Sequence, residues 1–213
     1  MFDINFTQVF VSFIVLLCSL TVHELAHAWT ADRLGDPTAR LLGRVSFNPI
    51  VHADPVGTVL FPLLALAGGF PLIGWAKPVP VNLSRLGRGR RDYVLVSAAG
   101  PLSNLVLAAI AAVVLRGALV GAGTMGERSV WAPLVPLAGG AIHLNVLLAV
   151  FNLLPIPPLD GGNVVGGLLP QSLGERFDAV RPYGFMLIYA LMLTGTLGSM
   201  VTAPYSLLLS WLL

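Results

Sequence analysis

Two histidines and a glutamate stand together in the stretch Thr21–Trp29, which reads TVHELAHAW. On a helix, residues four positions apart lie on the same face, so His23 and His27 can bind one metal ion. Glu24 stands beside them and can take a proton from a water on that ion. This H-E-x-x-H pattern predicts a hydrolytic metal site. The alternative is that the three side chains only form hydrogen bonds at a helix end.

A third ligand is required, because catalytic zinc sites carry three protein ligands plus a water. The best candidate is Asp160, which follows an apolar segment and three prolines. Gly161 and Gly162 come next, and we expect them to allow the backbone turns that aim the carboxylate. The predicted metal ligands are therefore His23, His27 and Asp160.

The composition is that of an integral membrane protein. Of 213 residues, 56% are hydrophobic and 10% are charged, whereas soluble domains are about 25% charged. A net charge of +2 from scattered basic residues does not indicate a nucleic-acid partner. The single Cys18 excludes a disulfide framework and a cysteine-rich zinc site. We find no repeat and no soluble appendage, and expect one domain over residues 1–213.

Four apolar segments have the roughly 20 residues needed to cross a bilayer. A fifth, residues 56–75, is broken by prolines and glycines and continues as extended chain to residue 82. We expect it to be a re-entrant helix/strand element, followed at the end of the chain by a short C-terminal apolar segment. The predicted fold is an all-α polytopic membrane protein with about four full transmembrane helices, at residues 4–31, 93–115, 134–154 and 182–201.

The basic residues favour re-entry over a fifth span. With re-entry, ten of the twelve lysines and arginines share one side of the membrane, and only Arg116 and Arg128 lie opposite. The positive-inside rule makes the richer side cytoplasmic. The same topology ends the first and third spans on one side, where Asp160 can reach His27. We expect a multi-pass membrane protein with its site toward the cytoplasm.

Four further polar residues are candidates for contact with a substrate. Asn152, at the end of the third span, can donate to an oxyanion or form an interhelical hydrogen bond. Asn145 lies in the same span, where a substrate contact competes with the same structural role. Asn104 ends a stretch of small residues in the second span, which either packs closely against the first helix or lets Asn104 contact substrate. His52 precedes the re-entrant element and either contacts substrate or belongs to a structural loop.

Five motifs together resemble the site-2 proteases, a family of intramembrane zinc metallopeptidases. They occur in family order and cover nearly the whole chain: HELAH at 23–27, NPIVHADPVGT at 48–58, GWAKPVPVN at 74–82, AGPLSN at 99–104 and NLLPIPPLDGG at 152–162. The chain is similar to a compact prokaryotic member, and we expect it to lack the PDZ and CBS domains of larger members.

The resemblance implies one Zn²⁺ per chain, held by His23, His27 and Asp160. It implies that Glu24 is the general base and that Asn152 assists at the transition state. The implied substrates are single-span transmembrane proteins in membrane lipid, cut within the membrane. We expect any regulatory partner to be a separate chain, and the oligomeric state stays open.

Two other functions use the same residues. A metal or ion transporter could bind its cargo with the same ligands, but the outer half of the first span offers few polar residues for a path. A proteolytically inactive binder of membrane helices would have no use for the general base Glu24. Hydrolysis of peptide bonds is the hypothesis that uses every residue of the motif.

Overall fold

The computed structural model describes residues 6–61, 64, 75–125 and 129–213, and its regular elements within these ranges are all helical. The predicted all-α class is therefore confirmed. The α-helices are α1 (Phe6–Arg33), α2 (Thr38–Leu41), α3 (Pro49–His52), α5 (Arg90–Met125), α6 (Leu134–Asn152), α7 (Asp160–Leu168), α8 (Gln171–Asp178), α9 (Gly184–Leu193) and α10 (Thr196–Leu212). A π-helical turn, η1 (Pro55–Leu60), and the 3₁₀ turns η2 (Leu83–Arg85) and η4 (Arg181–Tyr183) connect them.

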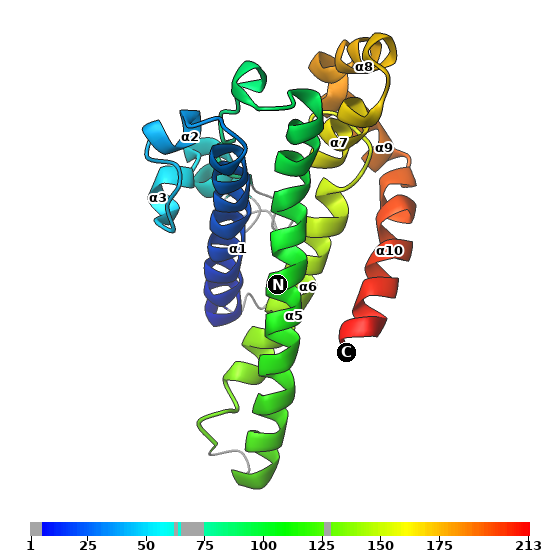
Figure 1. Cartoon of the computed structure of the whole chain (residues 1–213). Coiled ribbons are helices and arrows are strands. Elements are labelled where there is room, and N and C mark those ends of the chain that lie inside the picture. Colours follow the sequence, from blue (N-terminus) through cyan, green and yellow to red (C-terminus); the bar gives the residue numbers. More distant parts are fainter. Residues whose placement is uncertain (1–5, 62–63, 65–74, 126–128) are drawn as a thin grey trace.

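Within the described ranges, three helices are long and apolar enough to cross a membrane. They contain the candidate spans Phe10–Arg33, Arg90–Gly123 and Leu134–Asn152. These agree with three of the four predicted spans, although α5 continues well past the predicted end at residue 115. Figure 1 shows α1, α5 and α6 side by side, and α5 packs on both of the others.

Small residues let α5 and α6 approach closely. Ala108, Ala111 and Ala112 of α5 form a buried cluster with three branched side chains of α6, namely Ile142, Val146 and Val150. Small side chains at a helix interface bring the backbones together, which strengthens dispersion contacts where lipid supplies no hydrophobic driving force. Helix α10 covers the other side of this cluster through residues such as Tyr205 and Leu208.

The fourth predicted span is not one continuous helix. Helix α9 ends at Leu193 and α10 begins at Thr196, with a bend of 83° between the two helical segments. Gly195 has a φ of 73°, a left-handed conformation that glycine adopts without steric cost. The prediction of a single helix over 182–201 is therefore wrong, and the short C-terminal apolar segment is instead the end of α10 (Figure 1).

The chain between α1 and α5 leaves and returns at the same end of α1. The backbone N–H of Gly87 donates to the carbonyl of Leu34 at 3.1 Å. The N–H of Asn82 donates to the Asp36 carboxylate at 2.6 Å. Most of the predicted re-entrant element, 62–63 and 65–74, lies outside the described residues. Its described edges lie against α1, because Ala76 packs on Leu16 and Leu20.

The Asp36 side chain links the two ends of the segment between α1 and α5. Its side chain is fully buried, and one carboxylate oxygen accepts from the hydroxyl and the backbone N–H of Thr38. The other oxygen accepts from Asn82. Burial opposes ionisation, but these hydrogen bonds and the positive charge of Arg85 outweigh it. The pKa of Asp36 therefore lies below its ordinary value of 3.8.

We predict that Asp36→Asn lowers the free energy of unfolding by about 1–3 kcal/mol at neutral pH, because a buried donor loses its acceptor. The native carboxyl holds its proton less tightly than the unfolded one, so its contribution is complete well above pH 3.8 and disappears as the pH falls below that value. Thermal unfolding in detergent from about pH 6 to pH 3 measures both effects. Asp32→Asn, at a more exposed pair with Arg40, is the control. An equal loss in both variants contradicts the prediction.

Candidate metal centre

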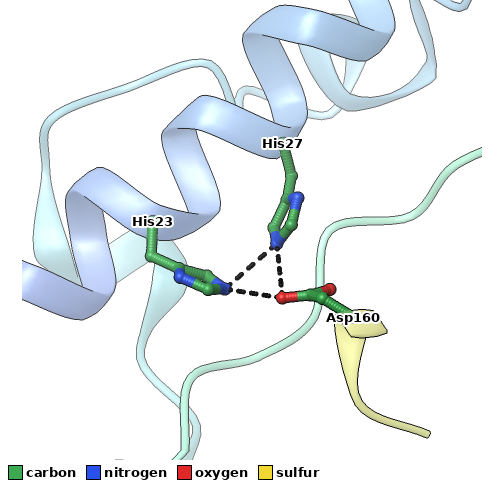
Figure 2. A group of neighbouring side chains, drawn as sticks. All are labelled: His23, His27 and Asp160. Carbon is green, nitrogen blue, oxygen red and sulfur yellow. Dashed lines mark hydrogen bonds and ion pairs between the residues drawn. The ribbon is translucent and has the colours of Figure 1, made fainter. Parts of the chain in front are cut away.

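Three side chains from distant parts of the chain converge on one point. His23 and His27 extend from the same face of α1, and Asp160 is the first residue of α7 (Figure 2). The two Nε2 atoms are 3.1 Å apart. The Oδ2 atom of Asp160 lies 3.1 Å from the Nε2 of His23 and 3.3 Å from that of His27. The structure thus brings together the three predicted ligands.

The outer nitrogens of both imidazoles have acceptors as partners. The Nδ1 of His23 lies 2.6 Å from the Oδ1 of Asn104, and the Nδ1 of His27 lies 2.7 Å from the carbonyl oxygen of Val96. A carbonyl oxygen can only accept, so each Nδ1 carries the hydrogen and each neutral ring leaves a lone pair on Nε2. Two lone pairs and a carboxylate oxygen then face one another, and they attract a shared cation.

The dimensions fit zinc. Ligand atoms about 2.0–2.1 Å from a tetrahedral zinc lie about 3.3–3.4 Å from each other, close to the observed separations of 3.1–3.3 Å. Two imidazoles and a carboxylate are an ordinary donor set for zinc, and three protein ligands leave one position open. His23 and His27 are both buried, so the site lies inside the protein rather than on its surface.

An amide chain supports His23 from two other helices. The side-chain nitrogen of Asn104, on α5, donates to the Oδ1 of Asn145 at 2.9 Å. Asn145, on α6, donates in turn to the carbonyl of Ala141. Asn104 is completely buried. Hydrogen-bonded partners of this kind fix the tautomer and orientation of a ligating histidine.

Gly100 lets α5 pass directly beside the two rings. A Cβ at this position would lie 2.6 Å from the Nε2 of His23 and closer still to the Nε2 of His27. The helix therefore has no room for a larger residue there. Gly100 and Asn104 are four positions apart, so one face of α5 both touches and orients the histidines.

The start of α7 delivers Asp160. Gly161 and Gly162 are helical, and a Cβ on either would collide with the backbone of the preceding loop, at Leu153 and Pro157 respectively. The expectation that these glycines serve backbone turns is wrong, since they serve close packing. The carboxylate that the first turn of α7 places opposite the two Nε2 atoms is the anionic ligand that a metal requires.

Glu24 is buried beside the two histidines on α1. Its Oε2 atom accepts a hydrogen bond of 3.0 Å from the backbone N–H of Val79, in the extended chain that precedes η2. The sequence motifs do not predict this contact. It fixes one oxygen of the carboxylate that the motif predicts to be a general base.

The other predicted site residues have partners of their own. Asn152 donates to the carbonyl of Leu148 in its own helix, and His52 bonds through Nε2 to the carbonyl of Ser46. Asn104 and Asn145 form the chain behind His23. Asn145 forms the interhelical hydrogen bond that was weighed for it, whereas the bond of Asn152 lies within its own helix. The predicted contacts of all four residues with substrate stay predictions.

Comparisons with known proteins agree with this geometry. The profile of peptidase family M50, the site-2 protease family, matches residues 11–127 and 117–195. The chain belongs to this family. The resemblance inferred from the five motifs is thereby confirmed.

Several known proteins are similar in sequence to this chain. "Putative zinc metalloprotease YwhC" of Bacillus subtilis is 42% identical over 200 residues, which are 90% of this chain and 83% of that protein. "Putative zinc metalloprotease Rip2" of Mycolicibacterium smegmatis is 35% identical over 85% of this chain, which spans 66% of the relative's length. The alignment with "Putative zinc metalloprotease Rip3" of Mycobacterium tuberculosis covers only 33% of that protein. No solved structure matches. Zinc is thus the cofactor that both the M50 relatives and the His-His-Asp cluster indicate.

We predict that Gly100→Ala reduces zinc retention at least about tenfold, because the new methyl group displaces α5 from the histidines that it supports. Zinc per purified chain, measured during titration with a chelator, tests this. Gly117→Ala is the matched control, since a Cβ at Gly117 of the same helix meets nothing within 4 Å. Equal zinc retention in both variants would refute the steric argument.

Asn104→Leu should also weaken zinc binding, by about 10- to 100-fold, because His23 loses the acceptor that fixes its tautomer. The same chelator titration measures it, with Ser103→Ala as control, since the Ser103 hydroxyl bonds within its own helix. If Asn104 only contacts substrate, the variant will keep wild-type zinc affinity and lose only cleavage.

Proposed function

We propose that this protein is an intramembrane zinc endopeptidase that cleaves transmembrane helices of membrane-protein substrates. The observation that carries the proposal is the convergence of the Asp160 carboxylate with two Nε2 lone pairs, and both histidines lie on an apolar helix long enough to cross a membrane. Family membership and the names of the relatives support proteolysis. The location of the ligands supports cleavage at membrane depth.

The proposed chemistry divides among few residues. His23, His27 and Asp160 would hold the zinc, which would supply a Lewis acid for the scissile carbonyl and for a water. Glu24 accepts the proton of that water and delivers it to the leaving amine. Because Val79 holds Oε2, the Oε1 atom is the one free to exchange protons. Asn152 assists by donating to the oxyanion, for which its amide must leave the carbonyl of Leu148.

The proposed topology places the site toward the cytoplasm. The described ends of the segment between α1 and α5 meet through Asp36 and Asn82, which supports re-entry from one side. A further crossing by the bent pair α9 and α10 completes four spans of a multi-pass protein. The proposed substrates are single-span proteins that enter from the lipid.

Glu24→Gln is the direct test. The variant should keep its zinc and lose cleavage of single-span reporter proteins at least about 100-fold, because the amide cannot accept the proton. Reconstituted protein and gel analysis of reporter fragments measure this. Glu175→Gln on α8 is the control, since Glu175 is exposed and its carboxylate accepts from Gln171. Cleavage by Glu24→Gln at the wild-type rate would refute the assignment of Glu24 as the general base of a zinc endopeptidase. Zinc flux into sealed vesicles, dependent on the same ligands, would favour the transporter.

A further inference from the structure

Arg44 is a buried cation without an anionic partner. Its residue is 6% exposed, and it forms no ion pair within the described part of the chain. One terminal nitrogen donates to the carbonyl of Lys77 and, at 3.4 Å, reaches that of Pro78. Its Nε atom is buried and has no hydrogen-bond partner among the described residues. Burying an uncompensated charge costs free energy. Hydrogen bonds to two carbonyls are a small return for this cost.

The carbonyls that Arg44 holds belong to a short extended segment, Lys77–Asn82. The segment is fixed at both ends, because the N–H of Lys77 donates to the carbonyl of His52 at 2.8 Å and that of Asn82 donates to Asp36. It passes along α1 on the side of Glu24. Its backbone position is therefore set by contacts with residues 36–52, which precede the predicted re-entrant element.

Only one backbone donor is available at the centre of this segment. Pro78 and Pro80 have no N–H, so the run Pro78–Val79–Pro80 can donate from Val79 alone. That single N–H bonds to the Oε2 of Glu24 at 3.0 Å. The carbonyls held by Arg44 belong to the two residues immediately before this donor. Any movement of Lys77 and Pro78 therefore moves the Val79 amide relative to Glu24.

We propose that Arg44 is a positioning residue for the general base: it fixes the backbone of Lys77 and Pro78 so that the Val79 N–H holds the Glu24 carboxylate. This inference rests on the proposed function, in which Glu24 is the base. A glutamate side chain has three rotatable bonds, and holding one oxygen leaves the other aimed at a defined point. Removing Arg44 lets the carbonyls of Lys77 and Pro78 shift between the two fixed ends, and Glu24 then samples orientations that do not reach the reacting water.

Two pairs of substitutions separate the steps. Arg44→Met removes the clamp, and Arg44→Lys keeps a cation that can still donate to the Lys77 carbonyl. Val79→Pro deletes the N–H that reaches Glu24, whereas Val79→Ala shortens the side chain and keeps that N–H. Arg40→Met is the control, because Arg40 is a nearby arginine whose side chain is 62% exposed and pairs with Asp32.

The first measurement needs no substrate. In zinc-loaded protein labelled with ¹⁵N-valine, the Val79 amide is assigned by its disappearance in Val79→Ala. We expect Arg44→Met to shift this resonance and to speed its hydrogen exchange at least about tenfold, the effect of losing one hydrogen bond. Arg44→Lys should give a smaller change and Arg40→Met none. An Arg44→Met protein whose Val79 amide matches that of Arg40→Met overturns the proposal.

The second measurement follows cleavage of a single-span reporter. Arg44→Met and Val79→Pro should each lower kcat about tenfold or more while KM and zinc content stay near wild type, the pattern of a lost transition-state interaction. Val79→Ala should lose much less than Val79→Pro. The double variant Arg44→Met/Val79→Pro should be no slower than Val79→Pro alone, because both changes break one linkage. The proposal is contradicted if the kcat losses of the two single variants multiply in the double variant. It is also contradicted if Val79→Ala and Val79→Pro lose the same kcat.

Failure of the proposed function gives different results from failure of the proposal for Arg44. If wild-type protein shows no cleavage that depends on Glu24, the peptidase assignment fails, and the Val79 resonance still decides whether Arg44 controls the contact with Glu24. If Arg44→Met does not fold, as judged by thermal unfolding and zinc content, Arg44→Lys and Val79→Pro carry the same comparison. Wild-type kcat in Val79→Pro then refutes the role of the N–H.

Discussion

Three atoms with lone pairs face one another inside a bundle of apolar helices, and this convergence is the constraint on which the rest of the structure depends. Polar groups away from water need hydrogen-bond partners, and acceptor atoms that face one another need a cation between them. The imidazoles meet this need on one side through Asn104 and the Val96 carbonyl. The facing Nε2 and carboxylate atoms meet it on the other side when they share a cation.

Helix α5 has the most demanding part in this arrangement. It must pass close enough to touch both rings, which Gly100 allows, and must then offer an acceptor one turn later, which Asn104 supplies. The small residues further along α5 serve the same approach, because they bring α6 near enough for Asn145 to complete the amide chain. Packing and chemistry are therefore set by the same helix face.

Local patterns in the sequence were sufficient to predict the three metal ligands. The spacing of His23 and His27 needs only one helix, and a topological argument from charge brought Asp160 to the same side. Gly100, the Val96 carbonyl and the Val79 amide were not predicted, since their roles depend on how far one element is shifted along another. Arg44 looks like any loop arginine in the sequence. The break at Gly195 was missed because a glycine in an apolar run is equally common in unbroken membrane helices.

The ligands of the metal are far apart along the chain, since 137 positions separate His23 from Asp160. An ion bound by both is a cross-link between the first helix and the beginning of α7, and it closes a loop that includes α5 and α6. The full ligand set forms only in a chain whose helices have already assembled, so the free energy of zinc binding adds to the stability of the folded state. Zinc would therefore hold the assembled helices together as well as serve as a cofactor.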